Sequence, residues 1–247
     1  MKTNTKQYLS AFGVVIIATL VGAFATLNLT FLKGFENAAS DIRISALQPP
    51  EEQSQKIVLA TITEETVALF QYRSPVDREF LANLIMLLQA KGAKAVGIDV
   101  LLDSPTEIEK DTYLKETLRN ATVPLFFSYT NSPGVVTEDQ LEYLNDFVPE
   151  KFRAAANMAT DPFDGTVRWI FPGETNAGMP VSFPRKGAEI YGIDTSNLFE
   201  KEKETQTNLP IAWRPKKDLE TPAFPEYPAH AVAVLPAEWF KDKIVLV

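Results

Sequence analysis

AVGIDVLL, residues 95–102, is a nearly continuous apolar run that a single carboxylate, Asp99, interrupts. Such a run is typical of a strand that is buried on both faces of a parallel sheet. Before it, residues 77–91 place their apolar side chains on one helical face, and Gly92 supplies a C-terminal stop. After it, residues 109–120 indicate a helix and residues 123–129 a strand. This alternation predicts an α/β fold with right-handed crossovers between parallel strands.

Segments farther out extend the same pattern. Residues 56–62 (KIVLATI) read as a buried strand, and residues 137–140 (TEDQ) form a capping-box pattern before a helix through Phe147. Most of the 17 prolines follow, which favours short strands and turns, and residues 200–204 read as an exposed charged loop. The chain closes on an apolar strand, residues 240–247, which either docks in the sheet or marks the truncation of a longer protein. We therefore expect a mixed, mainly parallel sheet with flanking helices.

The N-terminal segment has the properties of a membrane anchor. No residue from Tyr8 to Leu32 is charged, and a helix of these 25 residues would be roughly 37 Å long, enough to cross a bilayer core. Lys2 and Lys6 precede it, so the positive-inside rule predicts a cytoplasmic N-terminus. This gives a cytoplasmic tail of residues 1–7, a transmembrane helix and an exported domain.

A cleaved signal peptide is the alternative interpretation of this segment. Residues 23–25 (AFA) fit the small-x-small cleavage pattern that follows an apolar core. The apolar run continues beyond that site to Leu32, which favours an uncleaved anchor. Both interpretations export residues 33–247.

Composition excludes several classes of function. The chain of 247 residues has 24 Lys and Arg against 32 Asp and Glu, a net charge of −8, and no basic cluster, which argues against nucleic acid as a partner. It has no cysteine, so disulfides, thiolate metal sites and Cys nucleophiles are excluded. His230 is the single histidine, so a two-His metal site is excluded as well, and glycine-rich phosphate loops are absent. We predict neither a cofactor nor a metal.

Two aspartates are the best-placed site candidates. Asp99 and Asp103 have the same parity and, if the strand extends that far, lie on one face at its C-terminal end. In open α/β sheets that end is where ligands bind. The alternative is structural: Asp99 would accept hydrogen bonds within the fold and Asp103 would cap a loop.

Further charged candidates come from other segments. Arg78 begins the helix of residues 77–91, and Asp164 and Arg168 flank an Asp-Gly turn. The turn region, residues 161–165, lacks the alternating carboxylates of a calcium loop. We take Arg78, Asp164 and Arg168 as ligand-binding candidates beside the two aspartates.

In their order along the chain, these elements resemble the CHASE2 family, an extracytoplasmic sensor domain of bacterial membrane receptors. The resemblance rests on an Asp-x-Arg element at residues 41–43, a Pro-x-x-Arg element at residues 75–78, the segment of residues 91–101, a turn like the family's Asp-x-Asp-Gly-x-x-Arg at residues 161–168, and a closing strand at residues 241–247. It covers nearly all of the exported chain. It implies that a cytoplasmic output, such as an adenylate or guanylate cyclase or a protein kinase, follows in the complete receptor.

Three functions from different classes remain open. The first is an extracytoplasmic input domain, in the bacterial inner membrane, that binds an unknown small molecule or protein and shifts a conformational balance. The second is an exported hydrolase that uses Asp99 and Asp103. The third is an envelope scaffold that only binds a partner protein. The lipid bilayer is the expected partner of residues 8–32, and a second copy of the chain is a further partner left open.

Overall fold

A computed structural model of the protein describes all residues except 1–2, 29, 172, 174–177 and 197–208. The predicted loop at residues 200–204 therefore lies outside the described residues. The chain divides into two compact units. One comprises residues 1–49 with residues 161–166, and the other comprises residues 50–160 with residues 167–247.

The first unit contains two helices, α1 (Thr3–Asn28) and α2 (Thr30–Leu47). Within α1, the 18 residues Tyr8–Ala25 have a mean hydropathy of 2.1, and none of this window is buried. Among the described residues, this is the one helix long and apolar enough to cross a membrane. α1 ends at Asn28, a poor residue for a helix interior, so the last residues of the predicted span belong to α2.

The second unit is built on a six-stranded sheet in which every pair of neighbouring strands is parallel. Its order is β4-β3-β2-β8-β1-β7, with β1 Ile57–Thr61, β2 Ala95–Ile98, β3 Leu125–Tyr129, β4 Arg153–Ala155, β7 Glu226–Pro228 and β8 Ile244–Leu246. A separate antiparallel pair consists of β5 (Ala159–Thr160) and β6 (Val167–Trp169). The predicted α/β class with a mainly parallel sheet is confirmed.

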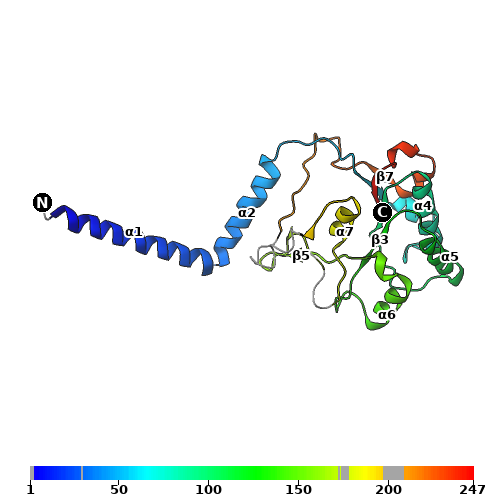
Figure 1. The fold of residues 1–247 in the computed structure, drawn as a ribbon, viewed down its shortest axis with the longest axis horizontal. Coiled ribbons are helices and arrows are strands. Elements are labelled where there is room, and N and C mark those ends of the chain that lie inside the picture. The colour runs from blue at the N-terminus through cyan, green and yellow to red at the C-terminus, as the bar shows by residue number, and fades with distance from the viewer. Residues whose placement is uncertain (1–2, 29, 172, 174–177, 197–208) are drawn as a thin grey trace. The chain divides into compact units, whose positions relative to one another are not determined.

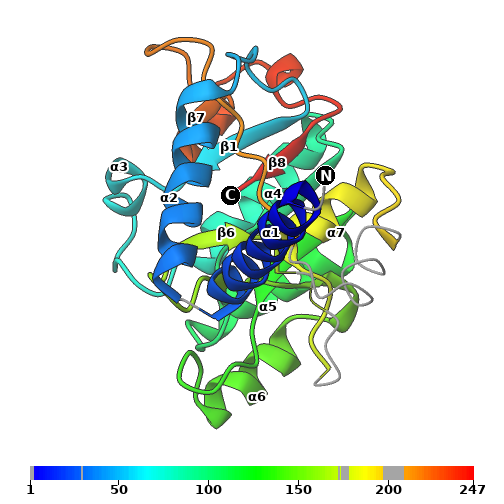
Figure 2. The ribbon, with the colours of Figure 1, turned by 90° about the vertical axis from the view of Figure 1, so that its left-hand side faces the viewer.

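Helices connect these strands and cover both faces of the sheet. α4 (Arg78–Ala90) and α5 (Ile108–Arg119) lie on one face, and α7 (Phe183–Ile190) lies on the other (Figures 1 and 2). The other helices that the described part of this unit contains are α3 (Glu64–Val67) and α6 (Glu138–Phe147), with short 3-10 helices η1 (Glu150–Phe152), η2 (Ala229–Ala233) and η3 (Ala237–Trp239).

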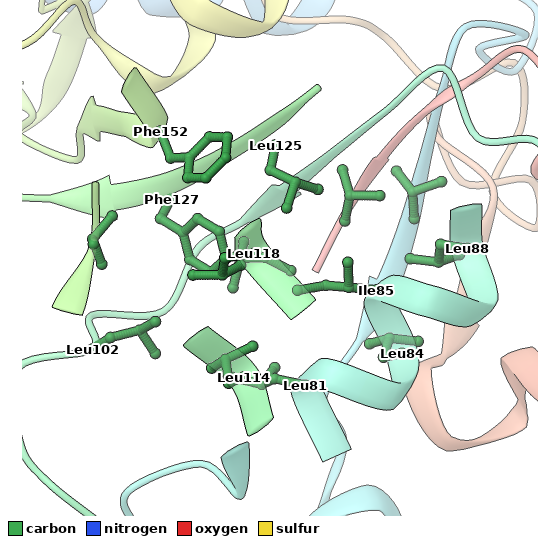
Figure 3. Close-up of a cluster of buried hydrophobic side chains, with 14 of the residues drawn as sticks. Leu81, Leu84, Ile85, Leu88, Leu102, Leu114, Leu118, Leu125, Phe127 and Phe152 are labelled. Atoms are coloured by element: carbon green, nitrogen blue, oxygen red, sulfur yellow. The ribbon is translucent and has the colours of Figure 1, made fainter. Parts of the chain in front are cut away.

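The main core lies between the sheet and the pair α4 and α5 (Figure 3). Leu81, Ile85 and Leu88 of α4 recur at helical spacing and are fully buried. Leu114 of α5 and Phe127 of β3 complete this layer. α4 begins where the prediction placed it, because the side chain of its N-cap residue, Asp77, accepts a hydrogen bond from a backbone N–H of the first turn.

A smaller core lies under α7. Phe126 of β3 packs against Phe183 of α7, with ring centroids 4.7 Å apart. Gly97 of β2 makes this possible, because a Cβ there would lie 2.6 Å from Cε2 of Phe126. The glycine in the AVGIDVLL segment is therefore a packing requirement.

The closing strand β8 lies in the interior of the sheet, between β1 and β2. Ile244 aligns with Ile57 on one side and with Ala95 on the other. The closing segment thus forms a strand that is docked in the sheet, one of the two explanations left open for it, although the regular strand is shorter than residues 240–247.

Candidate functional site

The carboxyl end of the sheet is where the sequence placed the candidate site. β2 ends at Ile98, and Asp99 follows it directly with an exposed side chain. Its backbone N–H donates to the carbonyl of Val247, and its carboxylate accepts a hydrogen bond from the hydroxyl of Ser128 in β3. Asp99 thus occupies the predicted edge and bridges two strands there.

Asp103 lies in the loop after β2, because the strand ends at Ile98; the condition under which Asp99 and Asp103 would share a strand face is therefore not met. Its Oδ2 accepts a hydrogen bond of 2.8 Å from Nε2 of Gln140 in α6, and its Oδ1 accepts one of 3.3 Å from Ser104. The strand stops early because the chain turns to bury Leu102 completely in the core with α4 and α5. Tertiary packing overrides the strand pattern here. The two carboxylates have separate partners.

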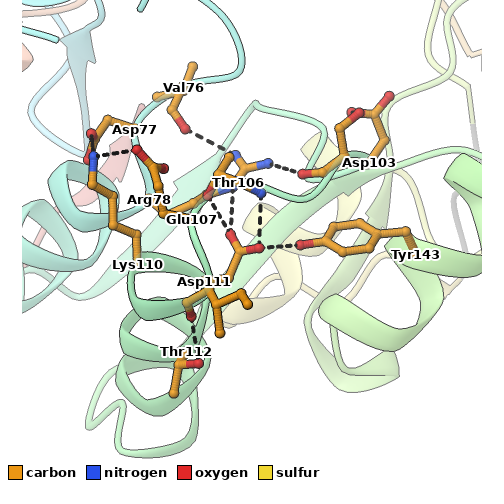
Figure 4. Close-up of polar contacts among 12 residues, drawn as sticks. Val76, Asp77, Arg78, Asp103, Thr106, Glu107, Lys110, Asp111, Thr112 and Tyr143 are labelled. Atoms are coloured by element: carbon orange, nitrogen blue, oxygen red, sulfur yellow. Dashed lines mark hydrogen bonds and ion pairs between the residues drawn. The ribbon is translucent and has the colours of Figure 1, made fainter. Parts of the chain in front are cut away.

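Arg78 is the centre of a buried polar network at this edge (Figure 4). Its side chain is 0% exposed. Nη2 donates to the carbonyl oxygen of Ser104 at 3.0 Å, and Nη1 donates to that of Val76 at 3.3 Å. Nε lies 3.7 Å from Oδ1 of Asp111 and has no hydrogen-bond partner among the described residues. Burial lowers the pKa of Arg78, and the nearby carboxylate of Asp111 opposes that shift.

Asp111 of α5 is the anionic partner in this network. Its carboxylate accepts hydrogen bonds from the backbone N–H of Thr106 at 3.0 Å, from the hydroxyl of Thr106 at 2.7 Å and from that of Tyr143 at 2.8 Å. Burial and the hydrogen bond to Asp111 raise the pKa of Tyr143. The network therefore joins α4, α5, α6 and the loop after β2.

A second layer of charges lies outside Arg78. Nζ of Lys110 lies 2.6 Å from Oδ2 of Asp77 and 3.2 Å from Oε1 of Glu107, and the hydroxyl of Tyr72 donates to Oε2 of Glu107 at 2.6 Å. The hydrogen bond to Asp77 raises the pKa of Lys110, and the one from Tyr72 lowers the pKa of Glu107. Tyr72, Glu107 and Pro75 border a depression of about 340 Å³.

The Asp-Gly turn contains another of the predicted residues, Asp164. Oδ1 of Asp164 accepts a hydrogen bond of 3.0 Å from the backbone N–H of Thr166, and Gly165 has a φ of 73°. In the same unit, Nδ2 of Asn37 donates to Asp161 at 2.6 Å. The structure thus confirms the predicted turn.

Arg168 lies in β6, in the two-stranded ribbon and not in the six-stranded sheet. Its backbone carbonyl accepts a hydrogen bond of 2.9 Å from the N–H of Ile211. Of the five predicted residues, the structure brings Arg78, Asp99 and Asp103 to the carboxyl end of the sheet.

Sequence reasoning missed three members of the network, Lys110, Asp111 and Tyr143. Lys110 and Asp111 lie in the first turns of a helix that the sequence did predict, but nothing in their spacing points to Arg78. Tyr143 reaches the network from α6, 32 residues after Asp111. Such long-range partners have no local signal in a single sequence.

This arrangement is better suited to hold the fold than to perform chemistry. Arg78, Asp111 and Lys110 each contact fixed internal partners, so the network fixes the loop after β2 against three helices. Among the described residues, no group of three His, Asp or Glu side chains could hold a metal ion. Fold and site define a class: an α/β domain whose chain begins with a helix able to span a membrane.

The family model described as "CHASE2 domain" matches residues 13–247, nearly the whole chain. The chain belongs to the CHASE2 domain family, a family of extracytoplasmic sensory domains. Neither a comparison with curated proteins nor one with solved structures found a significant match.

Proposed function

We propose that this chain is the input domain of a bacterial inner-membrane receptor and that it passes a stimulus to a cytoplasmic output, either a nucleotide cyclase or a protein kinase. The observation that carries the proposal is the CHASE2 match, which begins at residue 13 inside the membrane-capable helix and continues to residue 247. A single family model therefore includes both the anchor and the α/β domain. That combination suits a protein that senses on one side of a membrane and responds on the other.

Chain connectivity supports the proposal. Along the chain, one residue separates α1 from α2, and residues 48–56 then join α2 to β1 of the sheet. A stimulus that favours one conformation of the α/β domain has a short covalent route back to the membrane segment. The stimulus acts only if it binds the two conformations with different affinities.

Membrane topology is the first test. The chain contains no cysteine, so a single introduced cysteine is its only thiol. Thr3→Cys labels the predicted cytoplasmic tail, and Glu238→Cys labels an exposed position of η3. In intact spheroplasts, a membrane-impermeant maleimide should react with Glu238→Cys, and with Thr3→Cys only after lysis. The reverse pattern would overturn the proposed orientation.

Output is the second test. The complete gene product that contains these residues is expressed in membranes, and cyclic nucleotide formation and phosphotransfer are measured. Deletion of residues 50–247, which keeps α1 and α2, should change one of these activities. If both activities are the same with and without residues 50–247, or if neither activity is detected, the proposed coupling between this domain and a cytoplasmic output is contradicted.

A further inference from the structure

The face of the sheet under α7 contains an apolar pocket that none of the predicted site residues lines. Its volume is about 290 Å³. Phe126 of β3 and Phe183 of α7 form one side, and Ile57 of β1 with Ile244 and Leu246 of β8 form the floor. The pocket exists because α7 packs over β2, β3 and β4 and leaves β1 and β8 partly uncovered. Lys56, Ile57 and Ile244 place it at the amino end of β1 and β8, and it extends along β8 to Leu246; none of the residues of the Arg78 network lines it.

One lysine lines this pocket, and a second lies over the ring of one of its lining residues. Lys56 lines it, and its Nζ lies 5.2 Å from the ring centroid of Tyr191, another lining residue. Nζ of Lys94 lies 4.0 Å from the same centroid. Both lysines are exposed, and no ion pair to either is found among the described residues. Two cations thus converge on one aromatic ring that lines the pocket.

Strand register fixes this convergence. Lys56, Lys243 and Lys94 immediately precede β1, β8 and β2, which are adjacent in the sheet. The N–H of Lys94 donates to the carbonyl of Lys243 at 2.8 Å, and the N–H of Ile244 donates to that of Lys56 at 2.9 Å. Three lysines are therefore in line at the amino edge, in a chain whose net charge is −8. This local excess of positive charge attracts anions.

We propose that this pocket binds a small apolar carboxylate, with its hydrocarbon part against Phe126, Ile57 and Ile244 and its carboxylate at Lys56 and Lys94. Charge complementarity selects this occupant, since the interior is apolar and its rim is cationic. The volume is near the lower limit for small-molecule pockets, which suits a ligand of about ten non-hydrogen atoms. Gly187 on α7 also lines the pocket, and a Cβ there would approach the Phe126 ring.

The proposed binding of a carboxylate does not depend on whether the domain has a signalling role. That its ligand is the receptor's stimulus rests on the proposed function. If the carboxylate binds but deletion of residues 50–247 leaves the output unchanged, the coupling fails and the site remains. If deletion changes the output but no carboxylate binds, the site fails and the coupling remains.

Phenylacetate and phenylacetamide are matched probes, because they share ring and size and differ in charge. Binding to the whole chain in phosphatidylcholine nanodiscs is followed by NMR of labelled isoleucine methyl groups, with empty nanodiscs as the blank. Phenylacetate should shift the methyl signals of Ile57 and Ile244 in a saturable way. Phenylacetamide should bind about tenfold more weakly. Equal affinities, or no saturable shift with either probe, overturn the proposal.

Three variants locate the site. Lys56→Gln and Lys94→Gln should each weaken phenylacetate about two- to fivefold and leave phenylacetamide unchanged. Ala188→Trp should fill the pocket and abolish binding of both probes. Lys151→Gln is the matched control, because Lys151 is also exposed over a ring, that of Phe152 at 4.6 Å, but outside the pocket. Equal losses in Lys151→Gln and Lys56→Gln overturn the assignment.

Two other occupants are outcomes of the same experiment. If the pocket receives a second copy of the chain, Ala188→Trp dissociates a dimer in sedimentation. If it receives a lipid, nanodiscs that contain phosphatidylglycerol shift the methyl signals of Ile57 and Ile244 without any added probe. Either result overturns the proposal.

Discussion

Arg78→Met tests whether the buried network holds the fold together. The substitution removes the hydrogen bonds to the carbonyls of Ser104 and Val76 and the ion pair with Asp111. Breaking a buried ion pair costs about 3–5 kcal/mol when the remaining charge has no partner. Asp111 retains its three hydrogen bonds from Thr106 and Tyr143, and its side chain is 14% exposed. We therefore expect a smaller loss in the free energy of unfolding, about 2–3 kcal/mol.

Urea unfolding of the whole chain, followed by circular dichroism, measures this loss. Arg73→Met is the matched control, because Arg73 pairs with Glu64 on the surface, where the two side chains are 71% and 79% exposed. Its loss should be below about 0.5 kcal/mol. An Arg78→Met loss as small as that of Arg73→Met would refute the structural role and return Arg78 to the candidates for ligand recognition.

Three more predictions concern single contacts. Gly97→Ala should cost about 1–3 kcal/mol in urea unfolding because its Cβ overlaps the ring of Phe126, and adding Phe126→Leu should recover part of the loss. Burial and Asp111 raise the pKa of Tyr143, so its contribution to stability is complete below its unfolded pKa of about 10 and is lost as the pH rises above it. Tyr143→Phe should therefore lose less stability than the unmodified chain between about pH 10 and 12, and an identical decline would contradict this. Thr137→Ala removes the N-cap of α6 and should lower the melting temperature, at a cost of about 1 kcal/mol, whereas Thr137→Ser should have little effect.

Local patterns predicted the fold well. The helix of residues 77–91 corresponds to α4, Arg78–Ala90, because one side chain caps its start and Gly92, with a φ of 77°, ends it. The capping box at Thr137 forms as predicted, with both reciprocal hydrogen bonds. Cap chemistry and helical periodicity act within a few residues, so a single sequence contains them. Strand order is not local, and nothing in residues 240–247 indicates that β8 lies between β1 and β2.

The candidate site was harder to predict for the same reason. Asp99 lies at the predicted edge of the sheet because it directly follows β2. Asp103 lies beyond the end of the strand, in the loop whose Leu102 is buried in the core. Val76, one partner of Arg78, is two residues away, but Ser104 and Asp111 come from α5 and the loop before it, tens of residues away. Sequence parity assigns a face only as far as the strand continues, and the end of a strand depends on tertiary packing.

The two ends of the sheet therefore have different physical characters. At the carboxyl end, internal partners hold Arg78 and its neighbours in a network that stabilises one conformation. At the amino end, the floor under α7 is apolar and the cations at its rim remain exposed, so a ligand can gain apolar burial and charge pairing there. That floor comes from β1, the first strand after α2, and from β8, the last strand. A ligand in the proposed pocket would thus contact β1, the strand that residues 48–56 connect to α2. A ligand can shift the equilibrium between two conformations only by the ratio of its affinities for them. A tenfold shift therefore requires about tenfold tighter binding to the favoured conformation.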